Sequence, residues 1–484
     1  MAKSQILALH QKLVNQEITL EQIKSLVGQK QNELKGSNTI INRALETNNL
    51  TELNKQLATN KNNLLFGIPY SLKDNIATDD VITTGGSLFL KNFTPPYNAT
   101  VYELLKTKNA ILTSKVNLDE FGLGGTGTFS AYGIVKNIHN HEHITGGSSS
   151  GSVNAVAYGE SIFSLGTDTG DSVRRPSSLT GVVGYKPSYG LLSRYGVYPY
   201  APSLDHVGII AQYVTDIAIV AQNITQFDEK DLTSQKIENS QFYDNLKTLD
   251  NITFGVIEGL EQYLDESVKA LYLKAIEQIK AHGFKVVAKA IDWRNAIVID
   301  PLYKAISYAE ASSCYANMTG ITFGTNFNPE IKGYENIIIN NRSKGFGRQL
   351  KRRFIIGEYI TKGSNYFNIY FQSRKCRAYL ARKFNQLMEN VDCLILPGAS
   401  STAHNINDTV NKTAQTTLAD DLLQLANFAA SPSITIPYQK AKNNLPFGLN
   451  LNCRINHDQK LLNIALSLEE IFDYKQGETP WLKI

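Results

Sequence analysis

Residues 144–187 read ITGGSSSGSVNAVAYGESIFSLGTDTGDSVRRPSSLTGVVGYKP. Two turns of small residues, 146–151 (GGSSSG) and 166–172 (GTDTGDS), lie on either side of an apolar segment that ends in the strand-like residues 162–165. Glycines at this density let several backbone N–H groups converge on one point, as an anion or a developing oxyanion requires. The stretch therefore predicts a site for a small negative charge.

Two other interpretations of this stretch are weaker. A flexible linker lacks large apolar side chains, whereas Val153, Phe163 and Leu165 are interleaved with the glycines. A phosphate-binding loop would need the order G-x-x-x-x-G-K-[ST], or G-x-G-x-x-G at the start of a helix, and neither turn has it.

The rest of the chain indicates an α/β fold. From Leu64 onward, short strands that are apolar on both faces alternate with helices, which is typical of a sheet covered on both sides. We expect strands at 65–69, 110–112, 162–165, 254–257, 284–287, 393–396, 433–436 and 447–451. The first sixty residues have helical apolar spacing in pieces, so we expect residues 1–60 to be a helical segment packed on a main domain of residues 61–484.

Composition excludes several classes of protein. The 484 residues are 42% hydrophobic and 19% charged with a net charge of +4, which indicates neither a dedicated nucleic-acid binder nor a membrane-surface protein. The four cysteines form no C-x-x-C pair and the start of the chain has no secretory pattern, so we expect reduced thiols in the cytoplasm. No apolar run reaches the roughly 18 residues of a membrane span.

A serine nucleophile in these turns needs a base. The histidines are poorly placed for this role, and His139, His141 and His143 lie in a polar loop without the helix that would present zinc ligands on one face, so we expect no metal site. Lys73 follows an apolar segment, and burial there would lower its pKa from about 10.4 toward neutrality. It is the alternative base.

Three motifs, GIPYSLKDNI around Lys73, GGSSSGS and GTDTGDSVRRP, together resemble those of the amidase signature family. The resemblance implies one large α/β domain with a mixed central sheet covered by helices on both faces, and a Ser-cisSer-Lys triad. Lys73 would be the general base, Ser148 the bridging serine after a cis peptide bond, and Ser172 the nucleophile. Backbone N–H groups of Thr169, Gly170 and Asp171, with that of Ser172, would form the oxyanion hole.

Further stretches are similar to one branch of this family, the glutaminase chains of the glutamyl-tRNA(Gln)/aspartyl-tRNA(Asn) amidotransferases, which are the A chains of those enzymes. They are residues 117–125 (NLDEFGLGG), 184–190 (GYKPSYG), 203–208 (SLDHVG) and 345–353 (GFGRQLKRR). This likeness implies that the chain hydrolyses glutamine, has no cofactor of its own, and sends ammonia to the B subunit of a cytoplasmic heterotrimer that is completed by a C subunit. The B subunit would use ATP and Mg²⁺ to amidate the mischarged tRNA.

The same resemblance implies a glutamine pocket. Arg352 would bind the α-carboxylate and Asp420 the α-ammonium, with Arg353 and Asp421 as close substitutes, while Tyr303, Gly124 and Gly125 line the pocket. An arginine suits the first role because its guanidinium binds a carboxylate through two hydrogen bonds.

Ser150 and Asp171 depart from the family pattern, which usually has glycine at both positions. If Asp171 had to adopt a positive φ, the strain would cost about 1 kcal/mol. Its carboxylate would also disfavour the anionic transition state unless it pointed away, for instance to Arg174 or Arg175.

Two alternative functions follow from these residues. A free-standing amidase for small amides would not need Arg352 and Asp420. A catalytically silent scaffold protein would not need the triad.

Overall fold

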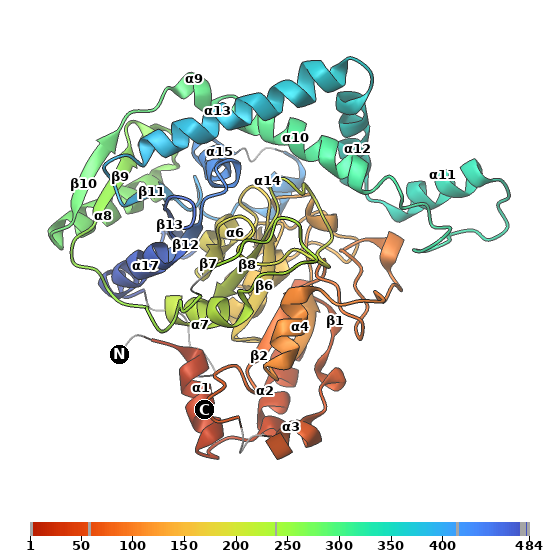
Figure 1. Cartoon of the computed structure of the whole chain (residues 1–484), viewed down its shortest axis with the longest axis horizontal. Coiled ribbons are helices and arrows are strands. Elements are labelled where there is room, and N and C mark those ends of the chain that lie inside the picture. Colours follow the sequence, from red (N-terminus) through yellow and green to blue (C-terminus); the bar gives the residue numbers. More distant parts are fainter. Residues whose placement is uncertain (1–2, 57–59, 238–239, 413–415, 475–480, 482–484) are drawn as a thin grey trace.

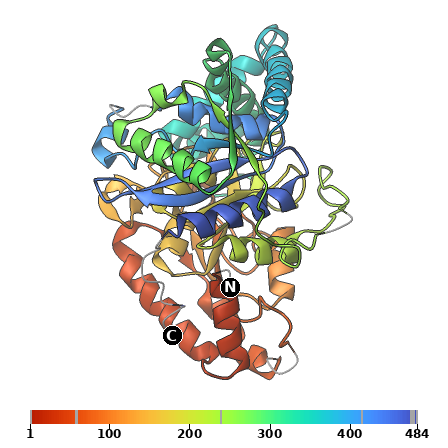
Figure 2. The same cartoon turned by 90° about the vertical axis from the view of Figure 1, so that its left-hand side faces the viewer.

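A mixed β-sheet runs through the molecule in the computed structural model, which describes residues 3–56, 60–237, 240–412, 416–474 and 481 (Figures 1 and 2). Within these residues the sheet has 11 strands in the order β1-β3-β2-β6-β8-β7-β12-β13-β11-β9-β10. The pairs β3–β2, β2–β6, β11–β9 and β9–β10 are parallel, and the other neighbours in the sheet are antiparallel. The strands of the sheet are β1 (Ile40–Arg43), β2 (Pro69–Lys73), β3 (Ile111–Val116), β6 (Phe163–Asp168), β7 (Val183–Lys186), β8 (His206–Ala211), β9 (Thr253–Ile257), β10 (Lys285–Lys289), β11 (Cys393–Pro397), β12 (Ser433–Lys440) and β13 (Pro446–Asn452). A separate hairpin pairs β4 (Lys136–Asn137) with β5 (Asn140–Ile144).

Helices connect and cover these strands. The α-helices are α1 (Gln5–Val14), α2 (Leu20–Glu33), α3 (Leu50–Gln56), α4 (Thr100–Thr107), α5 (Ser150–Tyr158), α6 (Arg174–Thr180), α7 (Val214–Ile224), α8 (Glu266–Ala281), α9 (Trp293–Ala296), α10 (Ile299–Cys314), α11 (Tyr334–Gly345), α12 (Arg348–Thr361), α13 (Gln372–Leu387), α14 (Ile406–Val410), α15 (Leu418–Asp421), α16 (Leu425–Phe428) and α17 (Asp458–Phe472). Shorter helical turns are η1 (Leu34–Ser37), η2 (Leu45–Thr47), η4 (Leu88–Leu90), η5 (Glu120–Gly122), η6 (Leu260–Tyr263), the π-helical η7 (Tyr366–Phe371) and η8 (Leu422–Gln424).

The sheet is buried on both faces, as the alternation of side chains in β8 shows. Ile210 packs in a small cluster with Val153 of α5 and with Val173 and Val182, which flank α6, whereas Ile209 belongs to the main core together with α7. Because successive side chains in a strand point to opposite faces, α5 and α6 cover one face here and α7 the other. The predicted fold class, an α/β domain with a covered mixed sheet, is confirmed.

The N-terminal segment is joined to this core. Ile6, Leu9 and Leu13 of α1 are fully buried in the main core, and the carboxylate of Asp216 accepts hydrogen bonds from the backbone N–H groups of Gln5 and Ile6 at 3.1 Å each. The segment is not only helical, because residues 40–43 form the edge strand β1.

The strand predictions differ from the structure in places. The strand expected at 65–69 lies at 69–73. The apolar pattern used for the prediction stops before Ser71 and Lys73, which are polar but buried in β2. Strands β7 and β8 were not predicted from the sequence. Among the described residues, no helix is both long and apolar enough to span a membrane.

Candidate active site

Lys73 is the last residue of β2, a strand whose five residues are all buried. Its Nζ lies 2.7 Å from Ser148 Oγ, 3.0 Å from Ser149 Oγ and 2.8 Å from Thr167 Oγ1. Burial lowers the pKa of Lys73 to about 7, although the carboxylates of Asp119, Asp168 and Asp205 act in the opposite direction. A large fraction of this amine is therefore neutral near physiological pH and can accept a proton.

Ser148 lies in the turn that leads into α5. The peptide bond between Gly147 and Ser148 is cis, as the family resemblance implies. A Cβ on Gly147 would come within 2.2 Å of Asp119 Oδ2, so only glycine allows this close approach. Asp119 in turn accepts hydrogen bonds from the backbone N–H groups of Thr126, Gly127 and Phe129, and thus holds the loop around Gly124 and Gly125 against the serine turn.

Ser172 lies in the turn between β6 and α6. The carboxylate of Asp168 fixes this turn, since it accepts from the N–H of Val173 at 3.0 Å and from two guanidinium nitrogens of the buried Arg174 at 3.0 and 3.1 Å. Burial raises the pKa of Asp168, but Arg174 outweighs that effect and the pKa lies well below its usual range. The carbonyl of Ser172 accepts from the N–H of Ser149 at 3.1 Å, so the two serine turns are joined directly.

The turn at Ser172 offers free donors. Within the described parts of the chain, no hydrogen-bond acceptor is seen for the backbone N–H groups of Gly170, Asp171 and Ser172. Preorganised N–H groups of this kind are what an oxyanion hole requires.

Neither departure from the family pattern strains the backbone. Asp171 and Ser150 both lie outside the left-handed region, so no glycine is needed at either position. The Asp171 carboxylate forms an ion pair with Arg175, with Oδ2 2.8 Å from Nε. Burial raises the pKa of Asp171 to about 6, against the effect of Arg175.

A cavity of about 200 Å³ opens beside the turn at Ser172. Its lining includes many of the residues singled out from the sequence, namely Gly124, Gly125, Gly170, Asp171, Tyr303, Arg353, Asp420 and Asp421. The carboxylate of Asp420 already accepts from the N–H and hydroxyl of Ser400 and from the N–H of Thr417. Burial and the nearby Asp300 and Asp420 raise the pKa of Asp421 to about 7.

Arg352 and Arg353 point in different directions. Arg353 lies over the Tyr308 ring of α10, 5.1 Å from its centroid, donates to Tyr200 Oη at 3.2 Å, and makes no ion pair within the described residues. Arg352 is exposed and lines a separate cavity of about 700 Å³ with Arg348 and Lys344. Successive residues in a helix are rotated by 100°, so only one of the two can face the pocket beside Ser172.

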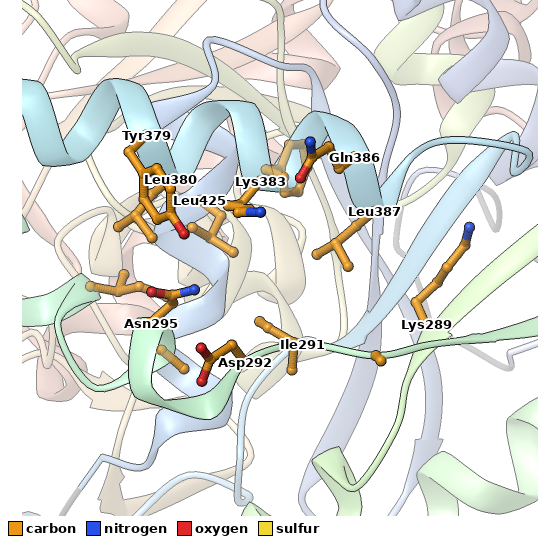
Figure 3. Close-up of a pocket in the computed structure, with 14 residues that line it drawn as sticks. Lys289, Ile291, Asp292, Asn295, Tyr379, Leu380, Lys383, Gln386, Leu387 and Leu425 are labelled. Atoms are coloured by element: carbon orange, nitrogen blue, oxygen red, sulfur yellow. The ribbon is translucent and has the colours of Figure 1, made fainter.

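Other candidate groups lie apart from this site. A cavity of about 320 Å³ between the β10–α9 connection and α13 contains none of the triad residues (Figure 3). It is lined by apolar groups together with Lys289, Asp292, Asn295, Tyr379, Lys383 and Gln386. His139 is tied by its Nε2 to the carbonyl of Thr180 at 2.9 Å. The described residues contain no group of three His, Cys, Asp or Glu side chains arranged to hold a metal ion.

The buried amine of Lys73 lies within hydrogen-bond distance of a serine that follows a cis peptide bond, and a turn with free N–H donors adjoins them. This arrangement is typical of serine-dependent amide hydrolases. The family model described as Amidase matches residues 20–462, and the chain belongs to the amidase family. The family resemblance predicted from the three motifs is thereby confirmed.

Relatives place the chain near one branch of this family. It is 43% identical to the A subunit of the glutamyl-tRNA(Gln) amidotransferase of Mycoplasma genitalium over 97% of this chain and 99% of the relative. It is 42% identical to the protein of the same name from Mycoplasma pneumoniae, covering 98% and 100%. The crystal structure of the corresponding A subunit from Thermotoga maritima superimposes with a TM-score of 0.75 at 29% identity, covering 95% and 94%.

Proposed function

We propose that this chain is the glutaminase component of a tRNA-dependent amidotransferase. The observation that carries the proposal is the amine of Lys73, whose pKa is lowered to about 7 and which lies 2.7 Å from Ser148 Oγ. The adjoining pocket contains the guanidinium of Arg353, which makes no ion pair within the described residues, and the carboxylates of Asp420 and Asp421. Glutamine needs all three features, because its side-chain amide is cleaved while its α-carboxylate and α-ammonium are held. The full-length similarity to the A subunits of glutamyl-tRNA(Gln) amidotransferases supports the same function.

The chemistry follows from the arrangement of the three residues. Neutral Lys73 accepts the proton of Ser172 through the Ser148 hydroxyl, and Ser172 Oγ attacks the side-chain amide carbon of glutamine. N–H groups of the Thr169–Ser172 turn stabilise the oxyanion, a contribution of roughly 3 kcal/mol for each well-placed donor in other hydrolases. Lysine then returns the proton to the leaving nitrogen, ammonia departs, and water attacks the acyl-serine to release glutamate.

The binding roles within the pocket belong to this proposal. We assign the α-carboxylate to Arg353 rather than to Arg352, since Arg353 is the member of the pair that lines the pocket. Asp420, with Asp421 beside it, receives the α-ammonium, and Tyr303, Gly124 and Gly125 enclose the substrate. In the complete enzyme the ammonia passes to the B subunit, which uses ATP and Mg²⁺ to amidate Glu-tRNA(Gln), Asp-tRNA(Asn) or both. The C subunit completes a cytoplasmic heterotrimer.

Glutamine hydrolysis tests the proposal, with the purified chain assayed alone and with its partner proteins. Ser172→Ala should abolish ammonia release, and addition of the partners with ATP and charged tRNA should raise it in the native chain. Hydrolysis of simple amides in preference to glutamine would favour a free-standing amidase. Absence of hydrolysis in both settings would favour a silent scaffold.

Two neighbouring variants test the substrate assignment. Arg353→Ala should raise KM for glutamine about 10- to 100-fold, the loss expected for a hydrogen-bonded charged group, while Arg352→Ala serves as the matched control and should change KM less than about threefold. For 4-aminobutanamide, which lacks the α-carboxylate, Arg353→Ala should have little effect. Equal effects of Arg353→Ala on the two substrates would contradict the assignment of Arg353 to the α-carboxylate.

A further inference from the structure

Residues 342–383, called here the cationic arm, concentrate the positive charge of the protein. They contain twelve Lys and Arg residues and a single acidic residue, Glu358. The whole chain has 48 basic and 44 acidic residues, so the arm carries +11 in a molecule whose other residues together carry −7. The arm comprises the end of α11, α12, η7 and α13, on the side of the molecule opposite α1, α2 and α3 (Figure 1).

The charges of the cationic arm are only partly offset by the protein itself, through the longer-range effects of carboxylates such as Glu310 on Arg377 and Glu120 on Lys351. None of its twelve basic side chains forms an ion pair with a residue that the structure describes, whereas other surface lysines do, such as Lys269 with Glu266 and Lys280 with Glu277. Eight of the twelve are exposed, namely Lys344, Arg348, Arg352, Lys362, Arg374, Lys375, Arg382 and Lys383. Uncompensated charge of one sign at this density attracts a polyanion and weakens the fold by self-repulsion, so it calls for an anionic partner.

Exposed aromatic rings alternate with these cations. The exposed rings of the arm are Tyr359 (62%), Tyr366 (38%), Phe367 (63%), Phe371 (41%) and Tyr379 (41%). Lys375 Nζ lies 4.7 Å from the Phe371 ring centroid and Lys383 Nζ lies 5.6 Å from that of Tyr379. Binding of an acidic protein surface would require only the cations. In a nucleic-acid complex, the cations contact phosphates and the aromatic rings stack on bases, so rings beside cations favour a nucleic acid.

A cleft at the base of the cationic arm continues this surface. The cavity of about 700 Å³ is lined by Lys344, Arg348 and Arg352 of the arm, by Lys412 and by the hydroxyl-bearing residues Thr128 and Ser130. Its one acidic lining residue, Glu120, accepts hydrogen bonds from Ser87 Oγ and from the N–H of Gly347, and burial raises its pKa to about 7. The cleft therefore presents four cationic side chains, Lys344, Arg348, Arg352 and Lys412, and side chains of this kind bind phosphate groups.

We propose that the cationic arm binds the phosphate backbone of transfer RNA, with unpaired bases stacked on its exposed rings. The inference rests on the proposed function, which supplies this RNA as the substrate of the assembled enzyme. It adds that the glutaminase chain itself contacts the RNA. The contact surface contains none of the triad residues, and Arg353 is its only residue that also lines the glutamine pocket.

Binding of a fluorescently labelled, unmodified tRNA transcript tests the inference. The test variant replaces Arg374, Lys375, Arg382 and Lys383 by Glu, and the control replaces Lys269, Lys274, Lys280 and Lys285 by Glu, which gives the same change of net charge on α8 and β10. Between about 50 and 200 mM salt the native chain should bind with a steep salt dependence, and the arm variant should bind more than about tenfold more weakly with a flatter dependence. The control should lose less than about threefold.

A second pair of substitutions separates stacking from charge. Phe367→Leu with Phe371→Leu keeps the surface apolar but removes the rings, so tRNA binding should weaken severalfold while the salt dependence stays unchanged. Glutamine hydrolysis is measured for every variant. If the native chain hydrolyses glutamine neither alone nor with its partner proteins, the proposed function fails.

Three results would overturn the inference while leaving that function intact. One is the absence of tRNA binding by the native chain and its complex. Another is an equal loss of binding in the arm variant and the α8 control, which would show that net charge alone matters. The last is unchanged tRNA binding of an arm variant that no longer associates with the partner proteins, which would identify an acidic protein as the ligand of the arm.

Discussion

Lys73 is the residue through which pH should control the reaction. Its pKa is lowered to about 7, chiefly by burial, and only the neutral amine can accept the proton of Ser172. Because protonation removes the base, kcat/KM for glutamine should fall about tenfold for each pH unit below about 7 and reach a plateau above about pH 8. The pH dependence of kcat/KM checks this prediction. A decrease of kcat/KM that already begins at about pH 9 as the pH is lowered would contradict it. Lys73→Arg, which stays charged throughout, should lose about 10²- to 10⁴-fold relative to the native plateau above about pH 8, and the loss should shrink as the pH falls.

Asp171 and Arg175 should behave as a coupled pair. The carboxylate lies beside the free N–H groups of the Ser172 turn, and Arg175 at 2.8 Å offsets its charge. Arg175→Ala leaves this buried acid without its cation next to a developing oxyanion, so kcat should drop about tenfold or more. Adding Asp171→Gly to that variant removes the acid and should restore most of the activity. A double-mutant cycle of kcat measures the coupling, and a double variant as slow as Arg175→Ala would show that the pair does not act this way.

At the scale of elements, the glutamine pocket depends on the packing of α12 against α10. Gly357 of α12 lies so close to α10 that a Cβ there would come within 2.0 Å of the Tyr308 carbonyl oxygen. Gly357→Ala must therefore push apart the helices that carry Arg353 and Tyr303, and KM for glutamine should rise about tenfold with a smaller change in kcat. The control is Gly28→Ala in α2, where a Cβ meets no atom within 4 Å. An unchanged KM for glutamine in Gly357→Ala would mean that the contact between α10 and α12 does not determine the geometry of the glutamine pocket.

The same two helices show what could and could not be predicted from sequence. The order of three motifs predicts Lys73, Ser148 and Ser172 as the triad. The two serines lie in turns whose glycines and small residues can be recognised from the sequence alone, whereas Lys73 ends strand β2 and was chosen by its motif. The choice between Arg352 and Arg353 was not settled by the motif. The buried positions Leu350, Phe354, Gly357 and Ile360 would have indicated it, since 353 shares their face of α12 and 352 does not.

Strand positions were harder to predict where polar residues are buried. Ser71 and Lys73 in β2 are stabilised by hydrogen bonds to serine and threonine side chains of neighbouring segments, and these partners are distant in sequence. The apolar pattern therefore ended too early and placed the strand before its actual position. The central strand β8 contains His206 and Gly208, so it lacks a continuous apolar run and was not identified.

At the scale of the whole molecule, a net charge describes this chain poorly. The value of +4 is an average over a body of −7 and an arm of +11. The average of +4 therefore gives no indication of a nucleic-acid binder, although one stretch of the chain is strongly basic. The basic residues lie in one stretch of sequence, 342–383, whose helices α12 and α13 lie on the side of the molecule opposite α1, α2 and α3 (Figure 1).

The N-terminal segment should unfold together with the active site rather than before it. Leu9 of α1 is fully buried in the same core cluster as Leu72 of β2, the residue before Lys73, and Asp216 of α7 holds the first turn of α1. Leu9→Ala should lower the free energy of unfolding by about 2 to 4 kcal/mol, because it leaves a cavity in this shared core. In urea, the midpoints for loss of helical circular dichroism and of glutamine hydrolysis should both shift down by the same amount. A helical signal that is lost early while the midpoint for hydrolysis stays in place would show instead that residues 1–60 form an independent unit, since a cavity there would then leave the fold around Lys73 intact.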